Sequence, residues 1–261
     1  RDEAAMIRQA WDRNGPTAHW RDRPADQPFF CVFNLMTTHQ SRTCVWPFEQ
    51  FEQQVASQLQ LNQRHDPRQV TLPPYYPDTP LVRRTWARYH DCITTMDQQV
   101  GQLLRELKQD GLADDTIVFV FADHGMGMPR GKRVLHDSGL RVPMLVRFPG
   151  KYRTWAPAQP GSTTDRLVSF VDFAPTVLSL AGVPLADWMQ GQPFLGHAAG
   201  PPRQYVFGAR DRVDRGDPDR PHTFIVADQA AVFRAETPVR VHASPGDNRQ
   251  PDAGLQSPLP A

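Results

Sequence analysis

Hydrophobic residues along the chain fall into short continuous runs, interrupted by one long helical repeat. The runs are rich in β-branched and aromatic residues and are bounded by polar or turn-forming residues, as is typical of strands buried in a sheet. They lie at residues 29–36 (FFCVFNLM), 116–121 (TIVFVF), 142–148 (VPMLVRF) and 204–208, with shorter candidates at 224–227 and 230–233. The pattern therefore predicts a sheet whose strands are widely spaced along the chain.

The helical repeat occupies residues 79–111. Thr79 suits the N-terminal cap, Pro80 the first helical position and Gly111 the residue after the last turn. Apolar residues recur between them at helical spacing: Leu81, Trp86, Tyr89, Ile93, Met96, Val100, Leu103, Leu104 and Leu107. We predict one long amphipathic helix here, followed by a short turn into the strand at 116–121.

Two shorter helices are predicted at 3–13 and within 169–181, where Asp172 suits the cap and Gly182 the end of the second one. The order strand, helix, strand between residues 29 and 121 is that of a β-α-β unit, which requires parallel pairing. The predicted fold class is therefore α/β, with a mostly parallel sheet flanked by helices.

Composition narrows the functional classes. The chain has 261 residues, 39% of them hydrophobic, which suffices for one large domain or one domain with a small appendage. Its formal charge of +1 gives no case for nucleic acid or an anionic membrane as a partner. No apolar run approaches the roughly 18 residues that a membrane-spanning helix needs. Cys31, Cys44 and Cys92 are scattered, so neither a zinc site nor a disulfide framework is expected, and Cys31 and Cys92 fit best as buried thiols.

Polar side chains follow the strand at 116–121. Asp123 and His124 project from its carboxyl end, the edge of an open α/β sheet where ligands bind. A carboxylate oxygen and an imidazole nitrogen side by side can bind one metal ion. The alternative is structural: Asp123 caps a turn and His124 hydrogen-bonds to a backbone carbonyl. The pair alone leaves both interpretations open.

The loop after this pair adds further polar groups. Lys132 follows a glycine and can hold an anionic group as a point charge, although most loop lysines are merely solvated. His136 lies in the same loop, where residues 137–139 can simply make the turn before the next strand. His39 stands directly after the first predicted strand, so it is a third polar group at a strand end.

In this order, the segments resemble the C-terminal half of the catalytic domain of the sulfatase family, within the alkaline-phosphatase-like superfamily. The resemblance rests on residues 29–39, 89–101, 111–148 and 169–196, and it covers about residues 28–212. Its most specific part is the run DHGMGMPRGKRVLHDSGLRVP, which begins at Asp123. Within the family, the chain most resembles the branch that includes heparan N-sulfatase and its bacterial relatives.

The resemblance implies part of an alkaline-phosphatase-like α/β fold, with a remnant of a small C-terminal α+β subdomain. It implies that Asp123 and His124 bind a divalent metal ion, usually Ca²⁺, with Zn²⁺ or Mn²⁺ as alternatives that imidazole suits. Lys132 matches the lysine that holds the sulfate oxygens, and His39 matches the histidine that faces the leaving-group oxygen as general acid. His136 is expected to contact the substrate. The implied substrate is a sulfated small molecule or glycan, and the implied location is the periplasm, the cell exterior or the lysosome.

Two features depart from the family pattern. The family nucleophile is a formylglycine made from the cysteine of a Cys-x-Pro-x-Arg motif, and none of the three cysteines has that context. The paired Asp-Asp metal ligands that follow the family's first strand are absent as well. We therefore expect an N-terminally truncated fragment, inactive alone, in which residues 1–200 are the C-terminal portion of the catalytic domain. Residues 201–261 are expected to be an incomplete or aberrant C-terminal subdomain or tail, produced by divergence or by a frame error in the gene.

Three functions stay open at this point. The leading one is a metal-dependent hydrolase of sulfuric esters or sulfamates. A phosphatase or phosphonate monoester hydrolase of the same superfamily is slightly favoured by His124, which replaces the commoner Asn. A non-catalytic remnant or binding module is the third, because the nucleophile motif is missing. A Cys-x-Pro-x-Arg nucleophile would favour the first function, and a Thr or Ser nucleophile the second.

Overall fold

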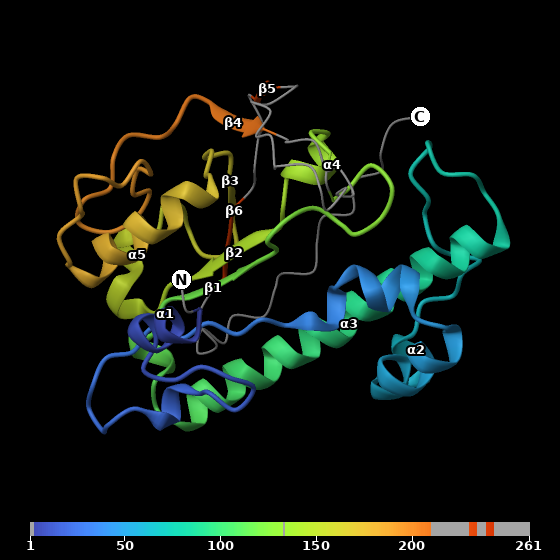
Figure 1. Ribbon diagram of the computed structural model, residues 1–261, viewed down its shortest axis with the longest axis horizontal. Coiled ribbons are helices and arrows are strands. Elements are labelled where there is room, and N and C mark those ends of the chain that lie inside the picture. Colours follow the sequence, from blue (N-terminus) through green and yellow to red (C-terminus); the bar gives the residue numbers. More distant parts are fainter. Residues whose placement is uncertain (1–2, 133, 210–229, 234–238, 243–261) are drawn as a thin grey trace.

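The computed structural model describes residues 3–132, 134–209, 230–233 and 239–242. Figure 1 shows one long helix, α3, below a small sheet, with α5 on the other side of the strands β1 and β2. The helices are α1 (Glu3–Ala10), α2 (Phe48–Gln54), α3 (Pro80–Gln109), α4 (Asp137–Leu140) and α5 (Phe173–Ala181). The strands are β1 (Val118–Phe121), β2 (Met144–Arg147), β3 (Thr163–Thr164), β4 (Val206–Ala209), β5 (Ala230–Phe233) and β6 (Val239–His242).

Helix α3 begins and ends where the sequence predicts. The Thr79 hydroxyl accepts a hydrogen bond from the Val82 amide at 3.3 Å, and Pro80 is the first helical residue. Gly111 adopts a φ of +74°, and the Leu112 amide donates to the Leu107 carbonyl at 3.0 Å. An N-terminal cap of this kind stabilises a helix by about 1 kcal/mol. The predicted helix is confirmed.

Three clusters of buried side chains hold the described residues together. Two of them lie against α3: one is built from Phe51, Val55, Ala56 and Cys92, and the other from Val70, Trp86, Ala87 and Met128. The third lies between the sheet and α5 and consists of Met144, Val146, Phe148, Phe194 and Leu195. The loop that follows β1 joins the α3 side of the molecule, because its Met128 belongs to the second cluster.

The sheet differs from the predicted mostly parallel arrangement. Its strand order is β1-β2-β6-β3, and β4 pairs separately with β5. Among the described strands, only β2 and β6 pair in parallel, whereas the pairs β1–β2, β3–β6 and β4–β5 are antiparallel. Val118 lies opposite Arg147 and Phe121 opposite Met144. The loop between β1 and β2 folds back on itself and reverses the chain, so no crossover helix separates these two strands.

Residues 29–36 are not a strand, contrary to prediction. The segment is extended but pairs with no described strand. Its side chains still alternate: Phe29, Cys31, Phe33 and Leu35 are partly covered, whereas Phe30, Val32, Asn34 and Met36 are exposed. Alternation needs only an extended backbone with one covered face, and α3 covers that face around Leu35 and Thr37. The predicted β-α-β unit is therefore wrong for the described residues.

Asp172 does not cap α5 with its side chain, contrary to prediction. The carboxylate is 1% exposed and accepts hydrogen bonds from Arg203 Nε at 2.7 Å and Arg203 Nη2 at 2.5 Å. It also accepts from the backbone amides of Ser169 at 3.2 Å and Gln192 at 2.8 Å. A buried carboxylate without such partners costs more free energy than a helix terminus without a side-chain cap. The predicted helix end at Gly182 is confirmed by its φ of +69°.

The remaining predictions concern short elements and the cysteines. β4 and β5 confirm the strands predicted at 204–208 and 230–233, and α1 confirms the first helix with an earlier end. The candidate strand at 224–227 lies outside the described residues. Cys92 is buried as predicted, Cys31 is only partly buried, and all three cysteines are free thiols. In the part of the chain that the structure describes, no helix is both long and apolar enough to cross a bilayer.

Candidate functional site

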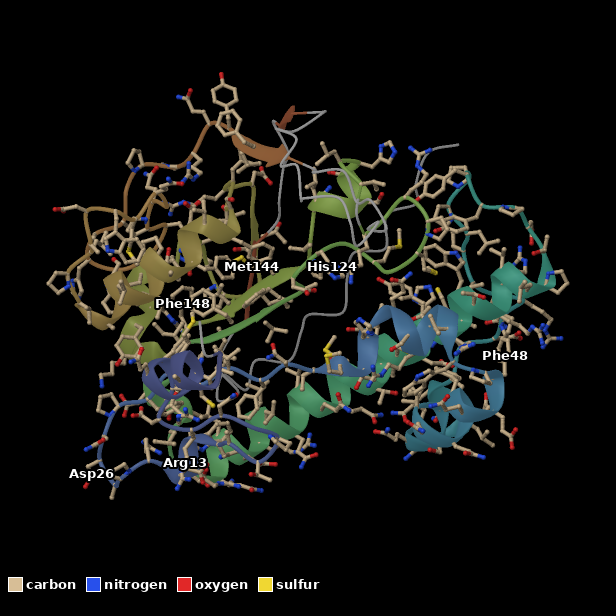
Figure 2. All side chains as sticks on the ribbon, viewed as in Figure 1. Arg13, Asp26, Phe48, His124, Met144 and Phe148 are labelled. Atoms are coloured by element: carbon tan, nitrogen blue, oxygen red, sulfur yellow. The ribbon has the colours of Figure 1, made fainter. Side chains whose placement is uncertain are left out.

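Asp123 and His124 follow β1 directly, and Figure 2 places His124 near the end of this strand. The His124 Nδ1 atom lies 2.7 Å from the Gly125 carbonyl oxygen. A carbonyl oxygen can only accept, so Nδ1 carries the proton and Nε2 of the neutral ring carries a lone pair. Nε2 lies 3.5 Å from Asp123 Oδ1. Two lone-pair atoms therefore face each other, an arrangement that a proton or a cation stabilises.

The loop after His124 is folded so tightly that glycine is required at several positions. A Cβ atom on Gly125 would collide with the Ser138 carbonyl oxygen, and one on Gly131 would collide with that of Met126. The Gly125 amide donates to the Gly139 carbonyl at 3.0 Å. Because backbone segments of this loop are in van der Waals contact with one another, the backbone positions from which its side chains extend are fixed.

Lys132 is presented by this loop. Its backbone amide donates to the Met126 carbonyl at 2.7 Å, which fixes the point from which the side chain leaves. Within the described residues, no acceptor pairs with the Lys132 ammonium group. An ammonium on a fixed backbone without an internal partner is available to an external anion.

His39 lies at the start of a short π-helix, Ser41–Val45. The Ser41 amide donates to His39 Nδ1 at 3.3 Å, and the Ser41 hydroxyl lies 2.9 Å from the same atom. Arg42 Nη1 donates to the Ser41 hydroxyl at 3.0 Å. A backbone amide can only donate, so Nδ1 is the acceptor and the proton of the neutral ring is on Nε2. π-Helical turns are frequent at functional sites.

Arg88 of α3 anchors this π-helix from the interior. Its guanidinium donates to the Arg42 carbonyl at 2.5 Å and to the Trp46 carbonyl at 3.1 Å, and it lies over the rings of Phe48 and Phe51. Arg88 is buried, and this burial lowers its pKa. The carbonyls at the end of the π-helix are thereby satisfied by a side chain of the long helix, which ties the position of His39 to α3.

The His39 segment and the loop that carries Lys132 meet at Gly127. A Cβ on Gly127 would lie 2.6 Å from Cβ of Gln40, and the Cys44 thiol lies 3.8 Å from the Gly127 carbonyl oxygen. The same loop is held from a third direction, because the Tyr76 hydroxyl donates to the Pro129 carbonyl at 2.6 Å. Two segments far apart in the sequence, one around Gln40 and Cys44 and one around Tyr76, thus contact the loop 125–132.

His136 lies outside the loop 125–132 and directly precedes the short helix α4. Its carbonyl accepts hydrogen bonds from the amides of Gly139 at 2.8 Å and Leu140 at 3.2 Å. Its side chain is exposed, and no described residue contacts it through a hydrogen bond. The local role of His136 is therefore carried by its backbone, and its predicted contact with substrate stays a prediction.

Asp123 and His124 fit a divalent metal ion as part of a ligand set. They offer one carboxylate oxygen and one imidazole nitrogen, and the Asp123 side chain is 85% exposed and free to turn. Ligands that lie about 2.0–2.5 Å from one ion are themselves about 3–4 Å apart, which agrees with the separation of these two atoms. No group of three or more His, Cys, Asp or Glu side chains suited to a metal occurs within the described ranges.

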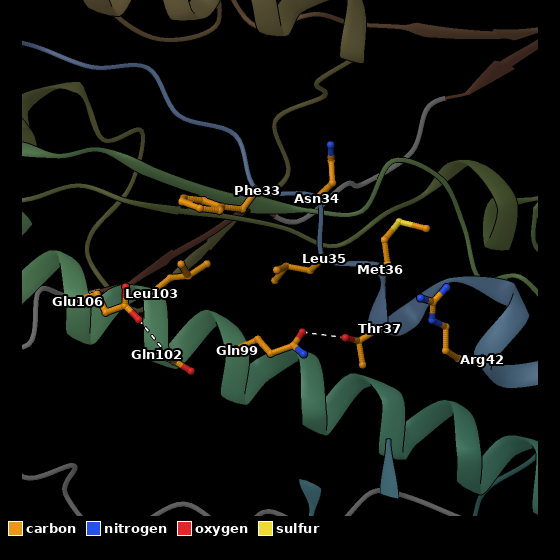
Figure 3. Close-up of a pocket in the computed structure, with 10 residues that line it drawn as sticks. All are labelled: Phe33, Asn34, Leu35, Met36, Thr37, Arg42, Gln99, Gln102, Leu103 and Glu106. Carbon is orange, nitrogen blue, oxygen red and sulfur yellow. Dashed lines mark hydrogen bonds between the residues drawn. The ribbon is translucent and has the colours of Figure 1, made fainter. Parts of the chain in front are cut away.

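A groove of about 410 Å³ runs beside the His39 segment, between residues 33–37 and α3 (Figure 3). The Thr37 hydroxyl donates to the Gln99 side-chain oxygen at 2.8 Å and so links the two sides of the groove. The groove is lined by Phe33, Asn34, Leu35, Met36, Thr37, Arg42, Gln99, Gln102, Leu103 and Glu106. None of the five predicted site residues is among them, so this hollow does not mark the chemistry and we assign it no role in the site.

Sequence reasoning missed Ser41, Arg42 and Arg88. Ser41 was detectable, since a hydroxyl residue two positions after a histidine often bonds to it locally. Arg88 interrupts the apolar stripe of the predicted helix, and a charge at such a position indicates an internal partner. The identity of that partner follows only from the tertiary fold.

Comparison with known proteins adds the following. A family model described as Sulfatase matches residues 16–183. An ulvan-active sulfatase of Formosa agariphila is 39% identical over 233 residues, which cover 78% of this chain and 37% of that protein. Human N-sulphoglucosamine sulphohydrolase is 34% identical over 126 residues, which cover 48% of this chain and 24% of the human protein. An endo-4-O-sulfatase of Bacteroides thetaiotaomicron is 38% identical over 100 residues, 36% of this chain and 18% of that protein. The chain thus spans well under half the length of each of these relatives.

Proposed function

Because the chain belongs to the sulfatase family, we propose that it supplies part of the catalytic site of a metal-dependent hydrolase of sulfuric esters or sulfamates. The relatives named for ulvan, for N-sulphoglucosamine and for endo-4-O-sulfate support a sulfated glycan as the substrate class. The matching run around Lys132 and the geometry of His39 support the assignment of roles below.

The observation that carries the proposal is the separation of 3.5 Å between Asp123 Oδ1 and His124 Nε2, the ring nitrogen that the Gly125 carbonyl leaves available to a metal ion. The Gly125 carbonyl fixes the tautomer, as backbone carbonyls commonly do for metal-binding histidines. Asp123 and His124 would hold a divalent ion, Ca²⁺ by family precedent, with Zn²⁺ or Mn²⁺ as the alternatives. When bound, such an ion polarises the sulfate group.

Lys132 and His39 act on the two ends of the bond that breaks. The Lys132 ammonium holds the sulfate oxygens and stabilises their charge in the transition state. His39 presents the N–H of Nε2 to the leaving-group oxygen or nitrogen and donates a hydrogen bond or a proton there. We assign to His136, whose side chain is exposed, a contact with the remainder of the substrate.

No nucleophilic step is assigned to a residue of this chain. The cysteines at 31, 44 and 92 lack the Cys-x-Pro-x-Arg context that yields formylglycine. The expected function of the described residues is therefore binding, orientation and charge stabilisation. This can be measured without turnover.

The test is a calorimetric titration of the chain with inorganic sulfate in the presence of Ca²⁺. Lys132→Ala should weaken sulfate binding about tenfold or more, because it removes a charge-assisted hydrogen bond. Lys108→Ala is the matched control, since Lys108 is an exposed lysine in the last turn of α3. If Lys132→Ala binds sulfate as tightly as the unchanged chain, the role assigned to Lys132 is wrong.

A phosphatase or phosphonate monoester hydrolase is the second candidate, and His124 is the observation that favours it. An imidazole ligand suits Zn²⁺ or Mn²⁺ better than Ca²⁺. The same titration distinguishes the two candidates when it is repeated with inorganic phosphate and with Zn²⁺. Tighter binding of phosphate with Zn²⁺ than of sulfate with Ca²⁺ would favour the second candidate.

A further inference from the structure

Arg130 has an unusual backbone conformation. Its φ is +66°, in the left-handed region that side chains with a Cβ rarely adopt. Among the residues that the structure describes, the other non-glycine residue with a positive φ is Asp26, a short polar residue of the kind that tolerates this region. Glycine would occupy this position with less strain. The chain has arginine here and glycine at the next position. Such strain persists where the surrounding structure imposes it, and it often marks a functional segment.

The surroundings do impose this conformation. The Tyr76 hydroxyl donates to the Pro129 carbonyl at 2.6 Å, and the Ser138 hydroxyl donates to the Arg130 carbonyl. The Gly131 amide donates to the carbonyl of the buried Met128 at 2.9 Å. The backbone on both sides of Arg130 is thus fixed by hydrogen bonds, and its side chain leaves the loop in a defined direction.

The Arg130 side chain lies over Tyr75. Its guanidinium carbon is 4.6 Å from the centre of the Tyr75 ring, and Tyr75 is 41% exposed. A cation–π contact holds the guanidinium without using its N–H groups as hydrogen-bond donors. No carboxylate or carbonyl of the described residues accepts from these groups. Arg83, by contrast, is ion-paired with Asp78 at 2.5 Å.

We infer that Arg130 and Tyr75 form a second anion-binding position, for a carboxylate or sulfate on the saccharide next to the one that carries the reacting sulfate. The inference rests on the proposed function, because Lys132, two residues further along the same rigid loop, is the group assigned to that reacting sulfate. A guanidinium matches a carboxylate or sulfate through two parallel hydrogen bonds. Two cationic groups on one fixed loop bind two anions of one molecule more tightly than either anion alone.

The experiment compares two probes at one salt concentration: inorganic sulfate and a heparin hexasaccharide, which carries sulfates and carboxylates on adjacent sugars. Arg130→Gly removes the side chain while suiting the backbone conformation, and Arg130→Ala removes it without that benefit. Both should weaken hexasaccharide binding about tenfold or more and leave sulfate binding unchanged. Arg13→Ala is the matched control, because Arg13 is exposed and lies far from His124 in Figure 2.

The outcomes separate this inference from the function on which it rests. If Arg130→Gly binds the hexasaccharide like Arg13→Ala while Lys132→Ala loses sulfate, the second position is refuted and the proposed function stands. If Lys132→Ala loses neither probe, the proposed function itself fails. Arg130→Lys keeps the charge but not the planar donor set, so it should retain only part of the hexasaccharide affinity. Full retention would refute the guanidinium geometry.

Discussion

The two histidines of the candidate site are held through their Nδ1 atoms by opposite partners. His124 Nδ1 faces a carbonyl oxygen at 2.7 Å and must donate, whereas His39 Nδ1 faces a backbone amide at 3.3 Å and must accept. In the neutral rings, Nε2 of His124 therefore carries a lone pair, and Nε2 of His39 carries an N–H. The backbone next to each histidine sets its tautomer, which suits His124 to the proposed metal binding and His39 to the proposed hydrogen-bond donation.

Thiol reactivity tests the packing around α3 at the scale of single residues. Burial raises the pKa of Cys92 to about 11, so at pH 8 only about one molecule in a thousand carries the thiolate. Cys44 is exposed. We expect iodoacetamide at pH 8 to alkylate Cys44 well before Cys92 in the folded chain, as measured by peptide mass spectrometry.

Two controls accompany the alkylation experiment. In urea all three cysteines should react at similar rates, because unfolding removes the burial that protects Cys92. Cys44→Ser should remove the alkylation assigned to Cys44 and leave the slow rate of Cys92 unchanged in the folded chain. Equal rates for Cys44 and Cys92 before unfolding would contradict the packing of Cys92 against Phe51 and Val55.

At the scale of elements, the ion pair between Asp172 and Arg203 joins the start of α5 to the segment that leads into β4. Removing one partner leaves the other without its counter-charge, and breaking a buried pair costs about 3–5 kcal/mol. Asp172→Ala should therefore lower the free energy of unfolding by about that amount, measured by urea denaturation with circular dichroism.

A double-mutant cycle isolates the pair. Arg203→Met also removes the counter-charge but leaves the two backbone amides that donate to Asp172. If the pair is the cause, the double variant Asp172→Ala/Arg203→Met should be less destabilised than the sum of the two single variants. Strict additivity would show that the two side chains contribute independently.

The elements differ in how far the sequence predicts them. Helix α3 was predictable to its caps, because Thr79, Pro80 and Gly111 encode its ends locally. The segment 29–36 was predicted wrongly, because a continuous apolar run indicates coverage by other residues and says nothing of hydrogen-bonded neighbouring strands. The direction of β2 relative to β1 was unpredictable for the same reason. Residue types alone left the roles of Asp123, His124 and Lys132 open, and the family resemblance supplied the predicted assignments, which stay predictions. Arg88 and Arg130 depend on contacts with residues distant in sequence.

At the scale of the whole molecule, the candidate site lies where separately packed parts meet. The loop 125–132 packs through Met126 and Met128 against α3 and the segment around Val70. Further along the chain, Met144 and Val146 of β2 belong to the core that packs against α5. An ion bound as proposed at Asp123 and His124 would therefore sit at the junction of two cores, and its binding energy would stabilise the folded state of both.

This coupling predicts that a divalent ion raises the midpoint of thermal unfolding. At ten times the dissociation constant, binding to the folded state alone contributes about 1.4 kcal/mol, which corresponds to a shift of about 3–5 °C for a chain of this size. Scanning calorimetry with added Ca²⁺, and again after chelation, measures the shift.

Asp123→Ala should abolish the Ca²⁺-induced shift, whereas Asp187→Ala, at an exposed carboxylate outside the site, should preserve it. His124→Asn should reduce the response to Zn²⁺ more than the response to Ca²⁺, because an amide oxygen is the harder ligand. An unchanged Ca²⁺ shift in Asp123→Ala would mean that the ion binds elsewhere, and the assignment of this carboxylate would have to be abandoned.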